Sequence, residues 1–520
     1  MNAVVQPAPI APPSSPIPFT LRIGAGLVGV LIAVLVAGFN DVVTSVELTD
    51  IQGVLGIGHD EGTWLIALYD AFQVSAMAFA PWCSVTFSLR RFTMAMAGLL
   101  GLLAAIAPFM PNLPSLYILR AIQGFAGGAL PPMLMTVALR YLPPKIKIYG
   151  LGAYALTATF GPNVSTPIAA LAFEYLGWHA VFWEAIPLCI ISIALVAYGL
   201  PQDPLRLERF RQFDTRGLLL GFPAICMLVI GLIQGDRLDW FESPIICHLI
   251  IGGLFLFAMF LVNEWFHPLP FFRIQMLKSR DISFALIALA AVLVLAVANI
   301  RLPAGYLIEL RGYRPLELVP LSLAIALPQL VALPLVAALC NIRRVDSRWV
   351  LAIGALFMAA SAYGASFITA DWYRGNFYAL QMLEVIGQPM VVIPILMHAT
   401  MKLGPTDGPF VSGMFNMTKG FASALAAGLI SYLDTSREHT HSNVLLDQFG
   451  ANQFVLSNLS DRSHELIELA QAVREQALVL TVADIDLVMA GIAIALVVLT
   501  IFMPTRVYPP ASAQVSAAAR

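Results

Sequence analysis

Long apolar stretches separated by short polar segments run along the chain from residue 22 to residue 505. Each stretch is close to the roughly 20 residues that an α-helix needs to cross a hydrocarbon layer about 30 Å thick. Because lipid offers the backbone no hydrogen-bond partner, a segment inside it must be helical or part of a closed barrel, and the alternation of barrel strands is not seen. The pattern predicts fourteen membrane-spanning helices, at 22–48, 63–86, 92–110, 114–141, 147–173, 178–200, 215–235, 244–266, 282–303, 316–340, 348–369, 376–401, 408–433 and 485–505.

The composition supports a polytopic, all-α membrane protein. Of 520 residues, 59% are hydrophobic and 12% are charged, whereas soluble domains carry about 25% charged residues. This excludes a soluble enzyme and a disordered chain. The 29 basic residues do not exceed the 31 acidic ones, so no nucleic-acid partner is expected. Membrane lipid is the partner that the composition implies.

Basic residues predict the orientation of the spans. With the N-terminus inside, nineteen of the 29 fall in cytoplasmic segments and eight in outer ones, Arg301 among the latter, and two lie within helices. This asymmetry favours both termini in the cytoplasm. The proline-rich segment 1–21 and the segment 506–520 are predicted to be cytosolic tails, the first of them disordered.

No cofactor is predicted. The five cysteines lie in or at the ends of predicted spans, and no pair has the spacing of a metal site or the place of an outer disulfide, so no metal is expected. No glycine-rich loop followed by Lys and Ser or Thr is present, which argues against a pump driven by ATP. An ion gradient, a proton gradient above all, or passive diffusion would then drive transport.

The longest polar segment outside the spans is 434–484, on the outer side. Apolar residues at helical spacing between Leu456 and Leu480 predict an amphipathic helix outside the membrane. Two interpretations remain open for it, a surface lid and a docking site for a partner protein of the cell envelope.

Three charged residues share one depth within the predicted spans. At about 1.5 Å per helical residue, Asp41 lies roughly 8 Å below the outer boundary, and Asp70 and Arg120 lie roughly 10 Å below it. A carboxyl group beside a second one binds a proton more readily, while a guanidinium favours its ionised form. We expect Asp41 to carry a proton with Arg120 as its partner, and Asp70 to be a second acid or a contact for a cationic substrate. A static ion pair that holds helices together is the alternative.

Other polar residues in the spans are candidate substrate contacts. Glu384 and Glu184 would attract a cationic substrate, and Lys419 would bind an anionic one or pair with Glu384. The candidate substrate-binding set is Tyr69, Phe72, Gln73, Glu384, Gln388, Asn416 and Lys419.

Glycine and proline clusters predict close helix contacts and bends. Gly124, Gly127 and Gly128 follow Arg120 at a spacing that lets another helix approach. Gly161 and Pro162 interrupt backbone hydrogen bonding and favour a bend in their span.

These motifs together resemble the major facilitator superfamily, specifically its fourteen-helix drug:proton antiporter branch of the EmrB/QacA type. FNDVVTSVEL (39–48) is similar to the acidic signature of the first helix, and LYILRAIQGFAGGALPPM (116–133) to the arginine motif of the fourth. ATFGPNVSTP (158–167) keeps Gly161 and Pro162 of the antiporter motif, with Ser165 and Thr166 where glycines are usual. The loop between the second and third helices contains PWCSVTFSLRRF (81–92). It retains only the basic pair of the family's motif, Arg90 and Arg91, and Val85 stands where the motif has an acid.

The resemblance implies the major facilitator fold, with two six-helix bundles (22–200 and 282–505) and an inserted helix pair (201–281). It implies a proton-coupled exporter of drugs or small amphipathic compounds in the inner membrane, rather than an enzyme, and a periplasmic adaptor and outer-membrane channel as partners. Alternatives are a transporter of one metabolite, such as a siderophore, a lipid intermediate or an organic acid, and a sensor that does not transport.

Overall fold

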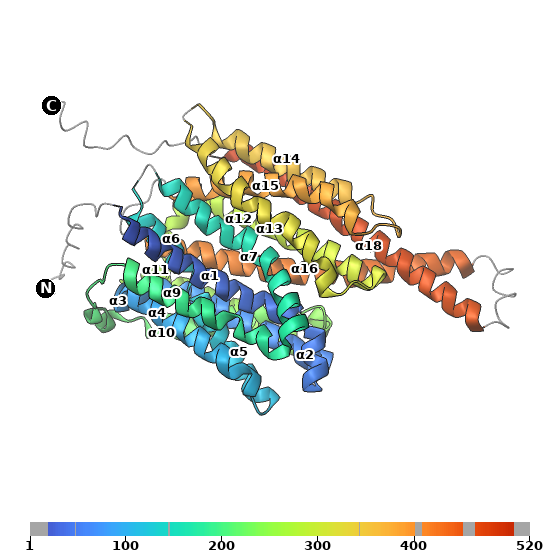
Figure 1. Cartoon of the computed structure of the whole chain (residues 1–520), viewed down its shortest axis with the longest axis horizontal. Coiled ribbons are helices and arrows are strands. Elements are labelled where there is room, and N and C mark those ends of the chain that lie inside the picture. Colours follow the sequence, from blue (N-terminus) through green and yellow to red (C-terminus); the bar gives the residue numbers. More distant parts are fainter. Residues whose placement is uncertain are drawn as a thin grey trace.

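The computed structural model describes residues 19–46, 48–143, 146–342, 344–400, 408–450 and 463–503. Within these ranges the chain is helical and contains no strand. The first helix begins and the last helix ends at the same end of the molecule (Figure 1). We call the end at which the first helix begins the near end, and the opposite one the far end.

The first half of the chain forms the elements α1 (Leu21–Val46), α2 (Leu48–Leu55), α3 (His59–Phe87), α4 (Leu89–Ile106), η1 (Ala107–Phe109), α5 (Leu113–Gly128), α6 (Pro131–Tyr141), α7 (Lys147–Leu176), α8 (Trp178–Trp183), α9 (Ala185–Gly199), η2 (Leu207–Gln212), α10 (Thr215–Gln234), η3 (Trp240–Glu242) and α11 (Pro244–Phe266). The second half forms η4 (Ile274–Lys278), α12 (Arg280–Arg311), α13 (Pro315–Asn341), α14 (Ser347–Ala365), α15 (Arg374–Thr400), α16 (Gly408–Gly450), α18 (Ser463–Leu499) and η5 (Thr500–Phe502). The η elements are short 3₁₀ helices.

The all-α membrane fold expected from the apolar stretches is confirmed. In the described part of the chain, 12 helical segments are long and apolar enough to cross a membrane. The two other predicted spans coincide with α7 and α16, which are long helices of lower hydropathy. Both helices pack against several others, α7 on α13 and α1, and α16 on α18, α3 and α12.

Two predicted spans are each divided into two helices. The span 114–141 ends as α5 at Gly128 and resumes as α6 at Pro131. The consecutive prolines Pro131 and Pro132 lack the N–H groups that would continue the helical ladder. The span 178–200 is interrupted at Glu184, between α8 and α9.

The bend predicted at Gly161 and Pro162 does not divide α7, which is one helix from Lys147 to Leu176. A Cβ at Gly161 would lie 3.5 Å from Leu35, an ordinary contact. The glycine therefore does not mark a close helix crossing here.

The predicted amphipathic helix is not a separate element. α16 continues to Gly450, well beyond the predicted span end at 433, and α18 begins at Ser463 and continues into the last span. Residues 456–462 of the prediction lie outside the described residues. The two helices project together past the far end (Figure 1), and His441 and Arg437 of α16 both contact Asp484 of α18, at 3.0 and 3.7 Å.

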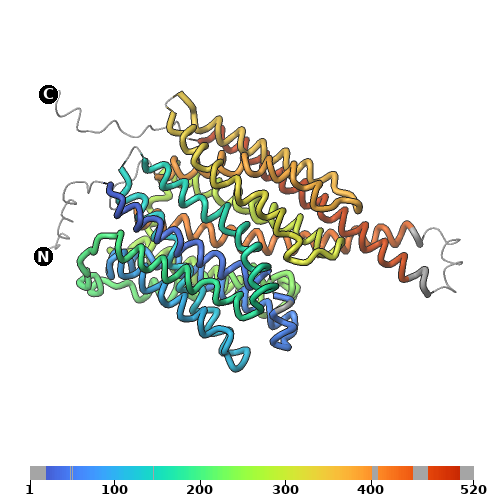
Figure 2. The backbone as a smooth tube through the Cα atoms, in the orientation of Figure 1, coloured from blue at the N-terminus to red at the C-terminus, as the bar shows by residue number. Residues whose placement is uncertain are grey.

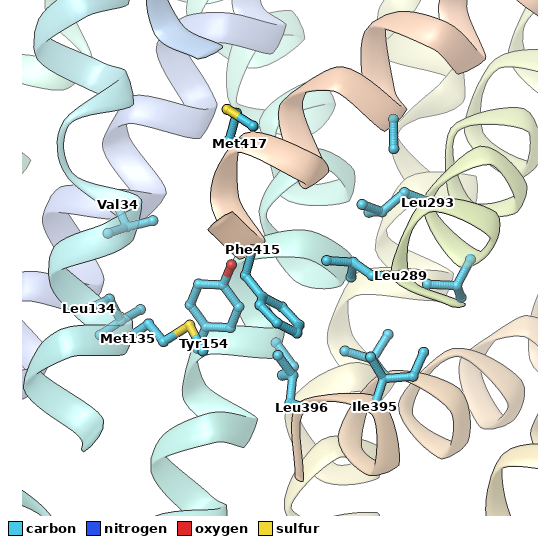
Figure 3. Close-up of a cluster of buried hydrophobic side chains, with 14 of the residues drawn as sticks. Val34, Leu134, Met135, Tyr154, Leu289, Leu293, Ile395, Leu396, Phe415 and Met417 are labelled. Atoms are coloured by element: carbon cyan, nitrogen blue, oxygen red, sulfur yellow. The ribbon is translucent and has the colours of Figure 1, made fainter. Parts of the chain in front are cut away.

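Helices α1 to α9 pack mainly on one another, and so do α12 to α18, while α10 contacts α3, α11 and α16. The tube in Figure 2 shows α7 and α13 running side by side along the seam between the two groups. The buried core crosses this seam. Tyr154 of α7 lies beside Phe415 of α16, with Leu396 of α15 below them (Figure 3).

Candidate functional site

Asp41 and Asp70, the two predicted acids, meet between α1 and α3. Their carboxyl groups are close enough to share a hydrogen bond, and the Gln73 side chain donates to Asp41 across 3.5 Å. Both aspartates are half-buried. Two carboxylates have no proton to donate to each other, so a hydrogen bond between them requires that one carboxyl be protonated.

Arg120 is not the ion-pair partner of Asp41 that the sequence predicts. Its guanidinium donates to Asn40 Oδ1 at 3.0 Å and to Gln123 Oε1 at 3.1 Å. It also lies 4.2 Å from the centre of the Tyr69 ring. Among the described residues no carboxylate oxygen lies within 4 Å of it, although both aspartates interact with it electrostatically at longer range.

The rotation of α1 explains this difference. Successive residues of an α-helix point about 100° apart, so when Asn40 faces α5, Asp41 points towards α3. Spacing along a helix predicts the depth of a residue but carries no information on this angle. A hydrogen-bonded arginine and a pair of acids therefore lie side by side in place of the predicted triad.

Arg301 of α12 is a member of the site that the sequence analysis missed. It was assigned to an outer segment, but α12 continues for ten residues beyond it, to Arg311. The side chain is exposed. It belongs to the other group of helices and interacts electrostatically with Asp70 and Asp41. The signal that would have placed it is Gly312, whose φ of 66° ends the helix as glycine commonly does.

Lys419, on α16, is half-buried and interacts with Asp41 rather than with Glu384. The acid pair thus faces one cation from each of three helices, namely Arg120, Arg301 and Lys419. Cations from both halves of the chain surround carboxyl groups that only the first half supplies.

The other predicted substrate contacts are packed against protein. Tyr69 is fully buried and donates from its hydroxyl to Ala37 O at 2.9 Å. The Phe72 ring packs edge-on against Phe222 of α10, at 5.3 Å between centroids. Tyr69 also interacts electrostatically with Asp41 and Asp70. The roles of Tyr69 and Phe72 as substrate contacts stay predictions.

Asn416 and Gln388 are also buried. Asn416 accepts a hydrogen bond from the Tyr154 hydroxyl at 3.0 Å and so joins α16 to α7. Gln388 donates to Glu384, one turn earlier in α15, at 3.1 Å. Glu184, between α8 and α9, has two buried carboxyl oxygens with no hydrogen-bond partner in the described part of the chain.

The predicted motif residues Arg90 and Arg91 begin α4 at the near end, half-buried and exposed respectively. Among the described residues neither forms an ion pair. At this end the two groups of helices are in close contact, because the Ser412 hydroxyl donates to Pro132 O at 2.7 Å. A Cβ at Gly413 would lie 3.0 Å from the Pro81 ring. The seam is closed here, whereas the charged residues nearer the far end remain partly exposed.

Replacing Arg120 by alanine is expected to destabilise the protein. The change leaves the buried oxygens of Asn40 and Gln123 without donors, which costs about 1–3 kcal/mol for each unpaired group. Arg120→Lys keeps the charge but not the fork of donors, so we expect an intermediate loss. The thermal unfolding midpoint of the purified variants measures this, and an Arg120→Ala midpoint equal to wild type would show that the hydrogen bonds do not support the fold.

Comparison with known proteins decides the family. Residues 30–339 match the family model described as Major Facilitator Superfamily, which is more than half of the chain. The chain belongs to the major facilitator superfamily. It is therefore a multi-pass membrane transporter, as the resemblance of its motifs implied.

Relatives in this superfamily are distant in sequence. The chain is 22% identical over 512 residues to the multidrug export protein EmrB of Escherichia coli, covering 92% of this chain and 96% of EmrB. It is 22% identical over 329 residues to the uncharacterized transporter YhcA of Bacillus subtilis, where the match covers 63% of this chain and 61% of YhcA. The crystal structure of the human organic anion transporter MFSD10 superposes with a TM-score of 0.57 at 10% identity, covering 93% of this chain and 100% of MFSD10. This likeness supports the same fold.

Proposed function

We propose that this transporter exports small amphipathic organic compounds in exchange for protons. The observation that carries the proposal is the close approach of the Asp41 and Asp70 carboxyl groups, which can share a hydrogen bond only when one of them is protonated. Ionisable groups within a membrane are costly and are retained on ion or proton pathways. The similarity to a multidrug export protein along nearly the whole chain supports the direction and the substrate class.

The cations around the acids supply a means of coupling. Arg301 and Lys419 lie on α12 and α16, across the seam from Asp70 and Asp41. In a carrier that rocks one half against the other, the distance between these cations and the acids changes with the conformation. When the cations approach, the acids release the proton, and when the cations withdraw, the acids bind it.

We further propose that the protein lies in the inner membrane of the cell with both termini in the cytoplasm, so that the far end is periplasmic. The nineteen basic residues on one side of the spans against eight on the other support this orientation. Because Arg301 lies within α12, the outer number falls to seven, and the asymmetry that supports the orientation becomes larger. In this orientation the partly exposed charges are open towards the periplasm.

The helix pair formed by α16 after residue 433 and by α18 before residue 485 is the proposed contact for a periplasmic adaptor protein, which would connect the transporter to an outer-membrane channel. It projects beyond every neighbouring helix (Figure 1). Tyr432, Val444 and Leu446 of α16 and Ile467 and Leu480 of α18 are large apolar side chains exposed on or beside it.

Proteoliposomes test the proposed exchange. Vesicles that contain the purified protein, a fluorescent amphipathic dye and a trapped pH indicator receive a pH gradient, with and without an uncoupler. We expect dye movement against its gradient together with proton movement in the opposite direction, and the loss of both with the uncoupler. Dye movement that is insensitive to the uncoupler would remove proton coupling, and the absence of movement for a panel of dyes would favour a transporter of one metabolite.

A further inference from the structure

A small cavity lies among α12, α14, α15 and α18, away from the site of Asp41 and Asp70. Its volume is about 30 Å³, which is enough space to admit water. Glu384 of α15 and Asp486 of α18 both line it. Their exposed fractions are only 3% and 8%, so two carboxyl groups are buried together inside the second half of the chain.

The hydrogen bonds of the two acids are few. Glu384 Oε2 accepts one from Gln388 Nε2 at 3.1 Å. Asp486 has no hydrogen-bond partner within the described ranges. The remaining amides in the wall, Asn299 and Gln381, are joined to each other at 3.0 Å. Asp486 is therefore a nine-tenths buried, unpartnered carboxyl group at the wall of a cavity that fits a very small ligand.

Among the residues that the structure describes, no cation pairs with these two acids. The charged groups of the surrounding helices that are named below interact with residues other than Glu384 and Asp486. Arg301 and Lys419 interact with Asp41 and Asp70. The others are Asp281 with His398, Glu309 with Arg474 and Glu438, Arg348 with Asp346, and Asp484 with His441 and Arg437. Glu384 interacts with Asp486 itself.

Two ionised carboxylates would be unstable in this place. A buried, unpaired charge is strongly unfavourable, and the repulsion between two of them adds to that cost. A protonated carboxyl carries no charge and gains an O–H donor.

We propose that Glu384 and Asp486 form a second proton-binding site, in which both carboxyl groups are protonated in this conformation. The site is distinct from the pair Asp41 and Asp70, and it does not depend on the exchange proposed above. Because its walls come from four helices, any conformation that separates α15 from α18 admits water and favours release of a proton.

Infrared spectroscopy of the purified full-length protein in lipid nanodiscs tests this proposal. Protonated carboxylic acids absorb at frequencies where carboxylates and amides do not. At neutral pH we expect Glu384→Gln and Asp486→Asn each to remove the absorption of one protonated carboxyl group, because each replacement is nearly isosteric with the neutral acid. Asp484→Asn is the matched control on the same helix, since Asp484 is paired with His441; it should leave this absorption unchanged.

The outcomes distinguish this site from the first one and from a metal site. The absorption should persist in the double variant Asp41→Asn and Asp70→Asn, whether or not that variant transports. If neither Glu384→Gln nor Asp486→Asn changes the absorption, the acids are ionised and the proposal is wrong. A sodium-dependent rise in the unfolding temperature of the wild type, relative to choline chloride and lost in both variants, would also overturn it and indicate a sodium site.

Discussion

Asp41→Asn is expected to abolish proton-driven dye export and leave the protein folded. The asparagine has nearly the same shape and still accepts the hydrogen bond from Gln73, but it cannot bind and release a proton at this position. We expect transport against the dye gradient to fall to the level of vesicles without protein. The measurement is dye and proton movement in the proteoliposomes described above, with the unfolding midpoint of the variant determined in parallel.

The matched control is Asp60→Asn, at the exposed start of the same helix that carries Asp70. Asp60 pairs with Arg237 at 2.7 Å and its side chain is 77% exposed, and such surface ion pairs contribute about 0–1 kcal/mol. Transport in this variant should equal that of the wild type. Unchanged export in Asp41→Asn would assign the proton to another group, and Asp70→Asn would then be the next variant to test.

Gly124→Ala and Gly128→Ala are expected to prevent correct packing of α5 against α3. A Cβ at Gly124 would lie 2.1 Å from Tyr69 O, and a Cβ at Gly128 would lie 2.1 Å from Gln73 O. Both contacts are with the backbone of α3, so no side-chain rotation relieves them. Overpacking of a well-packed interior costs about 1–3 kcal/mol, and we expect at least this loss for each substitution.

The yield of monodisperse protein in size-exclusion chromatography and the unfolding midpoint measure the effect. Gly491→Ala, in the membrane-spanning part of α18, is the control, because no atom lies within 4 Å of the position of its Cβ. This variant should be as stable as the wild type. If Gly124→Ala matches it, the close crossing of α3 and α5 does not exist in the membrane.

The helices themselves could be predicted well, because the period and length of apolar stretches report directly on the lipid environment. The predicted close approach at Gly124 and Gly128 was also correct, since only residues without a Cβ permit the observed contact with α3. The break between α5 and α6 was missed although Pro131 and Pro132 signal it. The continuation of α16 and α18 beyond the membrane was missed because hydropathy measures lipid contact and not helix length.

The candidate site was predicted in part. Asp41 and Asp70 were found because an acid in an apolar stretch is conspicuous in any sequence. Arg301 was not, because it lies near the end of its apolar stretch and its helix continues into polar residues. Asp486 was overlooked for the same reason, since it lies beside the start of the last predicted span.

The sequence by itself determined that this chain is a bundle of membrane-spanning helices with acidic groups at a defined depth. These properties depend on residue type and spacing along one helix. Only the tertiary structure decided that Asn40 rather than Asp41 binds Arg120, that Arg301 interacts with the acid pair, and that Glu384 lines the same cavity as Asp486. Such contacts depend on how each helix is rotated and on which helices are neighbours, and both follow from the packing of the whole bundle.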